Sequence, residues 1–491
     1  MRITLLEEMK KTALILLALI FLSCSGEYKS TFNNSPPNII IILVDDLGKE
    51  WLSCYGAEDI ETPNIDRLAQ SGIKFNHVYG TPQCTPSRVT LLTGQYPFRH
   101  GWVNHWDVPR WGGGAHFDES LNSALAVEMK KVGYKTCIAG KWQIDDFRVE
   151  PDAMTKCGFD EFCMWTGYES GNPPSGNRYH SPYIFTKDGS KTYENEYGPD
   201  VFKNFISEFI MANKDTSMFI YYPMVLTHTP FDNTPNDSAS TDLGRFKGMV
   251  KYTDMITGDL LHTLEEAGIR NNTLIIWTTD NGTSGKIAGT LNGRKVQGGK
   301  AATSEAGICL PFIVSWPSII DPEMTSNALI DFSDIFPTCL DIAGIAVGRE
   351  YKIGDQTHLI DGVSFKQVLV NEKNSIREWI MGMGGGNNAR LTEQGVENQY
   401  IFRDRVIRNE RFKLYLTTKR KAIGFYDLLE NPGEDINLID SLNTKLRKEN
   451  FNKLYQAVIS FPEKDEDPKY ESNPTQEWDV SISAKSQVWK K

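Results

Sequence analysis

A cysteine and an arginine one helical turn apart are the residues whose types and spacing most suggest chemistry. Cys84 and Arg88 lie in the run Cys-Thr-Pro-Ser-Arg-Val-Thr-Leu-Leu-Thr-Gly, which covers positions 84–94. Pro86 suits the first turn of a helix and Gly94 suits its end, so both side chains are expected on one helical face. Since a helix N-terminus favours anions, the run predicts a thiol and a guanidinium beside an anion-binding site. A capped surface helix with a chance cysteine is the alternative that these residues alone leave open.

Carboxylate and amide side chains follow two predicted strands that are distant in the sequence. Residues 38–44 and 272–278 are apolar and rich in β-branched residues, as buried parallel strands are. Ligands in open α/β sheets gather at the carboxyl ends of strands. The polar residues at these two ends are Asp45, Asp46, Asp280 and Asn281. Adjacent carboxylates repel each other unless a cation compensates them, and an all-oxygen set suits Ca²⁺ or Mg²⁺ rather than zinc. A capped strand end and an Asp-Asn-Gly turn are the simpler explanations of each pair taken separately.

The run at 84–94 resembles the signature of the type I sulfatases, which is Cys-x-Pro-Ser-Arg followed by Leu-Thr-Gly. In that family the cysteine is oxidised after translation to formylglycine, whose hydrate is the nucleophile. The resemblance therefore implies this modification of Cys84 and a formylglycine-generating enzyme as a partner. It also implies hydrolysis of sulfuric esters with one Ca²⁺, whose ligands would be Asp45, Asp46, Cys84, Asp280 and Asn281.

Other segments resemble elements of the same family, and the resemblance covers nearly all of residues 38–460. The matching segments are 62–69, 140–143, 228–230, 298–307, 333–345 and 425–438. The resemblance implies that Arg88, Lys141 and Lys300 stabilise the sulfate oxygens. His228, in a His-x-Pro element, would protonate the leaving oxygen, and Asp280 would assist deprotonation of the nucleophile.

Two positions depart from the family pattern. Gln143 replaces a histidine that is thought to help the second formylglycine hydroxyl lose its proton, which expels sulfate. Glutamine hydrogen-bonds but takes up no proton at ordinary pH, so we expect another base to serve; a slower step or a site without turnover are the alternatives. Cys309 replaces an arginine that follows the sulfate-binding lysine, and leaves that supporting contact open.

The pattern of apolar runs predicts an α/β fold with a mostly parallel central sheet flanked by helices, which the resemblance identifies as alkaline-phosphatase-like. Residues 38–372 are expected to form the catalytic domain, and residues 373–491 a smaller subdomain of antiparallel sheet plus helix with a charged tail. Helices are expected near 62–72, 121–132, 251–267, 333–345 and 441–460. Residues 165–200 show no regular pattern and fit either a substrate-binding loop or a packed surface excursion.

The N-terminus predicts export. Lys10-Lys11 precede the apolar run 13–22, which is too short to span a bilayer and is typical of a signal peptide over 1–23. Leu22-Ser23-Cys24 resembles a bacterial lipoprotein cleavage site, so Cys24 is a candidate for lipidation, with simple secretion as the alternative. Residues 24–37 would be a tether. The predicted location is therefore the periplasm or the cell surface, with membrane association only through a lipid anchor.

Charge and cysteine content limit the partners. The chain of 491 residues has a formal net charge of −11, which gives no basic footprint for nucleic acid. An anionic substrate must therefore be attracted by local cations. Of the eight cysteines, Cys137 and Cys339 are expected to be buried thiols, and a Cys157–Cys163 disulfide is possible.

The predicted substrate is a sulfated polysaccharide or oligosaccharide, because that is what an exported bacterial hydrolase of this kind most plausibly meets. The candidate substrate contacts are Gln143, Trp102, His105, Trp106, Arg178 and His180. Two alternative functions remain, a phosphodiesterase or phosphonate hydrolase of the same superfamily and a glycan-binding protein without turnover.

Overall fold

The computed structural model describes residues 36–102, 115–122, 124–166, 178–353, 355–384, 389–392, 395–398, 404–463, 466 and 470–472. Its central element is a ten-stranded sheet with the order β13-β2-β12-β9-β1-β8-β4-β5-β6-β7. In chain order the strands are β1 (Asn38–Val44), β2 (Ile73–Tyr79), β4 (Lys135–Lys141), β5 (Glu161–Trp165), β6 (Tyr183–Thr186), β7 (Gly189–Thr192), β8 (Met218–Pro223), β9 (Thr273–Thr279), β12 (Cys309–Ser315) and β13 (Met324–Asp331).

The predicted α/β class is confirmed, with a mixed sheet. The strands β9, β1, β8, β4 and β5 pair in parallel, as their continuous apolar sequences predicted. The strand β12 is antiparallel to both of its neighbours, and β5, β6 and β7 form an antiparallel meander at one edge. The polar segments that follow these strands therefore begin at the parallel centre of the sheet.

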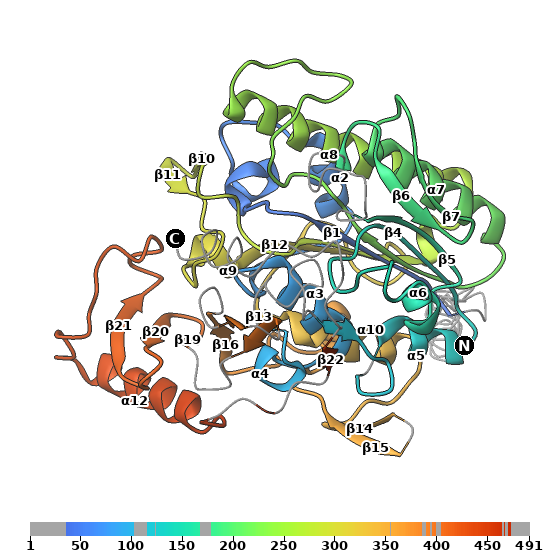
Figure 1. Cartoon of the computed structure of the whole chain (residues 1–491). Coiled ribbons are helices and arrows are strands. Elements are labelled where there is room, and N and C mark those ends of the chain that lie inside the picture. Colours follow the sequence, from blue (N-terminus) through green and yellow to red (C-terminus); the bar gives the residue numbers. More distant parts are fainter. Residues whose placement is uncertain are drawn as a thin grey trace, which may run out of the picture. The chain divides into compact units, whose positions relative to one another are not determined.

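Helices cover both faces of this sheet (Figure 1). One face carries α2 (Pro63–Gln70), α7 (Gly198–Asn213) and α8 (Asp242–Glu266), and the other carries α3 (Cys84–Thr93), α5 (Leu125–Lys131) and α10 (Ile335–Ile342). Alternate residues of β1 enter opposite cores: Ile39 and Ile41 join one, and Ile40 and Ile42 the other. This alternation is why β1 is apolar from Ile39 to Val44.

The C-terminal part forms a four-stranded antiparallel sheet packed against a helix, as the sequence predicted. Its strands, in spatial order, are β16 (Ile380–Met383), β19 (Arg405–Arg408), β20 (Phe412–Leu416) and β21 (Ala422–Asp427). The helix α12 (Lys445–Ile459) buries Leu454 and Val458 against them.

Short elements complete the described part. Two-residue connections join β10 (Ala288–Leu291) to β11 (Arg294–Gln297), β14 (Glu350–Ile353) to β15 (Gln356–Leu359) and β17 (Ala389–Thr392) to β18 (Gly395–Asn398). The strand β22 (Tyr470–Ser472) pairs with β3 (Ala115–Phe117). The short helices are α4 (Pro97–His100), α6 (Ala153–Lys156), α9 (Glu305–Ile308) and α11 (Lys366–Leu369), and 3₁₀ turns cover Lys49–Trp51, Ser53–Tyr55, Arg270–Asn272 and Phe332–Asp334.

The structure adds detail to the predictions about one helix, one loop and the cysteines. The helix expected at 251–267 begins earlier, at Asp242, where the side chain of Thr241 accepts a hydrogen bond from the amide of Gly244. The segment 165–200 contains β6 and β7. The possible Cys157–Cys163 disulfide is absent, since both are free buried thiols, whereas the burial of Cys137 and Cys339 is confirmed.

The described residues include no helix of the length and apolarity that crossing a bilayer requires. The signal peptide, Cys24 and most of the tether lie outside the described residues, and their assignment stays a prediction.

Candidate active site

The site begins where β1 and β9 end side by side. Val44 and Thr279 are register partners in the sheet, so Asp45 and Asp280 leave it at adjacent positions. The amide of Asp280 donates to the carbonyl of Val44 at 3.0 Å, and the amide of Asp46 donates to Asp280 Oδ1 at 3.1 Å. All three carboxylates are buried. The sheet therefore concentrates three acidic groups in one small volume, as the sequence predicted.

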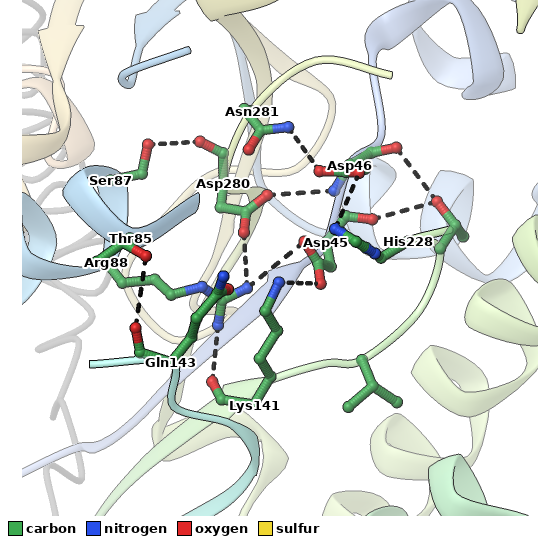
Figure 2. A network of polar contacts seen from close by, with 12 residues as sticks. Asp45, Asp46, Thr85, Ser87, Arg88, Lys141, Gln143, His228, Asp280 and Asn281 are labelled. Carbon is green, nitrogen blue, oxygen red and sulfur yellow. Dashed lines mark hydrogen bonds and ion pairs between the residues drawn. The ribbon is translucent and has the colours of Figure 1, made fainter. Parts of the chain in front are cut away.

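The helix α3 brings Cys84 and Arg88 to the same place, and Figure 2 shows Arg88 beside Asp280. Arg88 Nη2 donates to Asp280 Oδ2 at 2.6 Å, and its Nη1 donates to the carbonyl of Lys141 at 2.8 Å. Ser87 fixes the helix start, because its hydroxyl donates to the carbonyl of Asp280 at 2.6 Å. The thiol of Cys84 and carboxylate oxygens of Asp45 and Asp280 lie within 4.8 Å of one another.

Two lysines reach the carboxylates from other segments. Lys141, the last residue of β4, donates to Asp45 Oδ2 at 2.6 Å. Lys300, in the loop before α9, donates to Asp46 Oδ2 at 2.6 Å. Together with Arg88 they surround the acidic cluster with positive charge, and so provide the local cations that a chain of negative net charge needs to attract an anion.

His228 follows β8 and faces the cluster from a further side. Its Nε2 lies 3.7 Å from Asp46 Oδ2, and its Nδ1 lies 2.5 Å from the carbonyl oxygen of Thr229. A neutral ring with its proton on Nδ1 satisfies that carbonyl and leaves Nε2 toward the site. Burial and Lys300 hold the pKa of His228 well below its usual range.

The electrostatics show how strongly the acidic groups depend on the cations. Burial would raise the pKa of Asp45, but Lys141, His228 and Arg88 outweigh it and hold that pKa well below its usual range. For Asp280 burial and the nearby charge of Asp45 prevail over Arg88, and raise its pKa to about 7. Further positive charge is needed before all carboxylates ionise together.

The residues present fit a hard cation. Asp45 Oδ1 and Asn281 Oδ1 are buried acceptors that receive no hydrogen bond from the chain, so both atoms are suited to bind a cation. Asn281 is held by its own amide nitrogen, which donates to Asp46 Oδ1 at 2.7 Å. The predicted ligand residues Asp45, Asp46, Cys84, Asp280 and Asn281 therefore lie together, and their oxygens are those that Ca²⁺ or Mg²⁺ prefers.

Gln143 is joined to the start of α3 through Thr85, as Figure 2 shows. Its backbone has a positive φ of 61°, and its carbonyl accepts a hydrogen bond from Thr85 Oγ1 at 3.4 Å. Its side-chain Oε1 is buried and receives no hydrogen bond. Position 143 thus offers an acceptor to a neighbouring hydroxyl, although it cannot take up the proton.

The other predicted substrate contacts fall into different places. Trp102 is fully buried and its ring packs near Phe117, which is a core role in place of the predicted sugar contact. His105 and Trp106 lie outside the described residues. Arg178 lies in the site itself, with Nη1 at 3.7 Å from Asp45 Oδ2. His180 is about half exposed and its Nε2 lies 3.0 Å from the carbonyl of Asn233.

Sequence reasoning missed residues that support the site without entering it. Tyr179 donates its hydroxyl hydrogen to the carbonyl oxygens of Val225 and His228, and Thr227 Oγ1 approaches the carbonyls of Asp45 and Asp46 at 3.3 Å. A tyrosine or a threonine has no distinctive spacing in the sequence, so nothing in the pattern could have identified them.

Cys309 has a lysine beside it. Lys49 Nζ donates to Cys309 Sγ at 3.0 Å and to the carbonyl of Asn76 at 2.7 Å. Positive charge is therefore present at this position, although it comes from the loop after β1.

Comparisons with known proteins agree with this geometry. The family model described as Sulfatase matches residues 37–345. An N-acetylgalactosamine-6-O-sulfatase of Bacteroides thetaiotaomicron is 28% identical over 430 residues, which cover 74% of this chain and 82% of that protein. An ulvan-active sulfatase of Formosa agariphila is 27% identical over 475 residues, covering 91% and 82%. A structure solved in complex with its substrate D-glucosamine-2-N,6-O-disulfate shares the fold, with a TM-score of 0.68, 20% identity and coverage of 89% of this chain and 99% of that one.

Proposed function

The chain belongs to the sulfatase family, and we propose that it removes sulfate from a sulfated carbohydrate by the attack of a hydrated formylglycine at position 84 on sulfur. The observation that carries this proposal is the grouping of the Cys84 thiol with the carboxylates of Asp45 and Asp280 within 4.8 Å. Arg88 at the same point adds a guanidinium. A nucleophile, a cation site and anion-stabilising groups thus share one small volume.

Each charged residue of the site has a task in this reaction. Arg88, Lys141 and Lys300 would neutralise the sulfate oxygens, on which negative charge accumulates as the ester bond breaks. Asp280, fixed by Arg88 and by the amide of Asp46, would assist deprotonation of the attacking hydroxyl. Because these groups are buried and already oriented, little reorganisation is needed during the reaction.

The cation site is proposed to hold one Ca²⁺ through Asp45, Asp46, Asp280 and Asn281, with the side chain at position 84 as a further ligand. When bound, the ion would supply positive charge beside the nucleophile and a sulfate oxygen. His228, when its ring carries a proton on both nitrogens, would protonate the leaving alcohol from Nε2, while Nδ1 keeps its hydrogen bond to the Thr229 carbonyl.

The proposed substrate class is a sulfated polysaccharide or its oligosaccharides. Support comes from the relatives, of which one is named for N-acetylgalactosamine-6-sulfate and another for ulvan, and both belong to bacteria. We further propose that the chain is exported to the periplasm or cell surface, with Cys24 as a possible lipid anchor, and that a formylglycine-generating enzyme matures it.

The test combines one modification and one activity. Mass spectrometry of the peptide that contains residue 84 should show the mass of formylglycine, and the purified protein should release sulfate from sulfated saccharides. Cys84→Ala should release none, while the matched control Cys54→Ala, which removes a free, partly buried thiol in the turn Ser53–Tyr55, should retain release. Equal release by wild type and Cys84→Ala would contradict the proposal.

Parallel assays with phosphate monoesters, phosphodiesters and phosphonate monoesters separate the sulfatase from a phosphodiesterase or phosphonate hydrolase. We expect kcat/KM to be highest for sulfate esters. Binding of sulfated saccharide without release, by protein whose formylglycine is confirmed, would instead indicate a glycan-binding protein.

A further inference from the structure

We propose that Arg178 binds the scissile sulfate group directly, as a fourth cation beside Arg88, Lys141 and Lys300. This inference rests on the proposed sulfatase function and identifies a further catalytic residue for it. It changes the role of Arg178 from an outer sugar contact to an inner contact with the reacting group.

The position of the guanidinium carries the argument. Arg178 Nη1 lies 3.7 Å from Asp45 Oδ2, the oxygen to which Lys141 Nζ donates at 2.6 Å. The side chain of Arg178 is only 2% exposed. Two cations from different segments therefore converge on one carboxylate oxygen at the floor of the site, and an anion that reaches Lys141 also reaches Arg178.

The sheet explains why Arg178 lies beside Lys141. Trp165 ends β5 and is the register partner of Lys141, which ends β4. The guanidinium of Arg178 stacks on the ring of Trp165, with 4.1 Å between its central carbon and the ring centroid. Such stacking fixes the orientation of the guanidinium plane beside Lys141.

The backbone that carries Arg178 is held on both sides. The hydroxyl of Tyr179 donates to the carbonyl of His228 at 2.5 Å, which ties this segment to the proposed acid. The amide of Gly198 donates to the carbonyl of Tyr179 at 2.6 Å, and a Cβ at Gly198 would come within 2.2 Å of the Arg178 carbonyl oxygen. The close approach requires glycine, and a guanidinium fixed in this way loses little entropy when it binds a ligand.

The charge of the site favours the same conclusion. Three carboxylates, Asp45, Asp46 and Asp280, face four cationic side chains, before any dication is counted. A dication that occupies the carboxylates leaves this surplus positive charge for an anionic ligand. Gln143 adds no charge at its position, whereas Arg178 adds one, and its planar fork can bond two oxygens of a tetrahedral oxyanion.

The test measures binding apart from turnover. The full chain carrying Cys84→Ser is titrated with inorganic sulfate in the presence of Ca²⁺ by calorimetry, with and without Arg178→Met. Loss of charge-assisted hydrogen bonds should weaken sulfate affinity by about 10- to 100-fold. The matched control is Lys187→Met, which removes an exposed cation that pairs with Glu161 on the same meander and should leave the affinity unchanged.

The affinity for Ca²⁺ distinguishes a purely structural role of Arg178 from direct binding of sulfate. If Arg178 only compensated Asp45, Arg178→Met would change the affinity for Ca²⁺ and leave the affinity for sulfate unchanged at saturating Ca²⁺; that result would overturn the proposal. If Arg178→Met does not fold, Arg178→Lys keeps the charge and loses the fork, and should weaken sulfate binding by about threefold to tenfold. Unchanged sulfate affinity of a folded Arg178→Lys protein would likewise overturn it.

Failure of this inference and failure of the proposed function give different results. A wild-type protein that releases no sulfate from any ester, yet binds inorganic sulfate through Arg178, contradicts the function and supports the role of Arg178. A protein that releases sulfate with the same kcat/KM after Arg178→Met keeps its function and contradicts this inference.

Discussion

Lys413 is the residue whose removal should most weaken the attachment of the C-terminal sheet to the catalytic loop. It is fully buried, and its Nζ lies 2.9 Å from Glu305 Oε1 and 3.0 Å from Glu434 Oε1. Glu305 lies five positions after Lys300 and opens α9. Lys413→Met keeps the length of the side chain but leaves two carboxylates facing each other. Removing one partner of a buried pair costs about 3–5 kcal/mol, so we expect a loss of this size in the free energy of unfolding.

The loss should depend on pH with a defined sign. Burial would raise the pKa of Glu305, but Lys413 and Arg408 outweigh it and hold that pKa well below its usual range. A carboxyl group with a depressed pKa stabilises the fold above its unfolded pKa of about 4.3 and loses this contribution as the pH falls below it. In Lys413→Met the depression is smaller. The difference between wild type and variant is therefore largest near neutral pH and shrinks toward pH 4.

Urea denaturation at pH 7 and at pH 3.5, which lies below the unfolded pKa of about 4.3, measures both effects by tryptophan fluorescence. Lys419→Met is the matched control, because Lys419 is exposed on the turn between β20 and β21. It should change the free energy of unfolding by less than about 0.5 kcal/mol. A loss below about 1 kcal/mol for Lys413→Met, or an equal loss at both pH values, would refute the reasoning.

Two further predictions concern the site. Ca²⁺ added to chelator-treated protein at about 100 times its Kd should stabilise the fold by about 2.7 kcal/mol. For an unfolding entropy of about 1 kcal/mol per kelvin, this raises the midpoint of thermal unfolding by about 3 °C. Asn281→Leu should reduce this rise, and no rise in wild type would contradict the cation site. His228→Asn should lower kcat for a saccharide sulfate by about 10²- to 10⁴-fold. It should lower kcat for 4-nitrophenyl sulfate much less, because nitrophenolate leaves without protonation. Equal losses on both substrates would exclude His228 as the acid.

The parallel centre of the fold was predictable because its residues allow few alternatives. A strand such as β1, buried on both faces, is almost continuously apolar, and this pattern is visible in the sequence from Ile39 to Val44. The first turns of α8 were missed for a different reason. They contain Gly244 and Gly248, and glycine disfavours a helix. Asp237 Oδ2 lies 3.0 Å from the position that a Cβ at residue 248 would take. That approach is a tertiary contact, which local sequence does not reveal.

The same distinction applies to the site. Residues that carry a motif, such as Cys84 and Lys141, were identified from sequence, and the structure brings both to the carboxylate of Asp45. The location of Arg178 was not predictable, since its partner Trp165 becomes a neighbour of Lys141 only through the register of β4 and β5. A loop with no pattern of its own can therefore place a buried cation that no motif announces.

Gln143 and Arg178 together limit where the proton goes when sulfate is expelled. A histidine at position 143 would exchange protons near neutral pH, whereas an amide side chain does not. A guanidinium gives up no proton in proteins, so it stabilises an anion without serving as a base. If Arg178 binds the sulfate, it adds positive charge to the site but no proton acceptor. The proton released when sulfate is expelled must therefore go to a group other than residues 143 and 178.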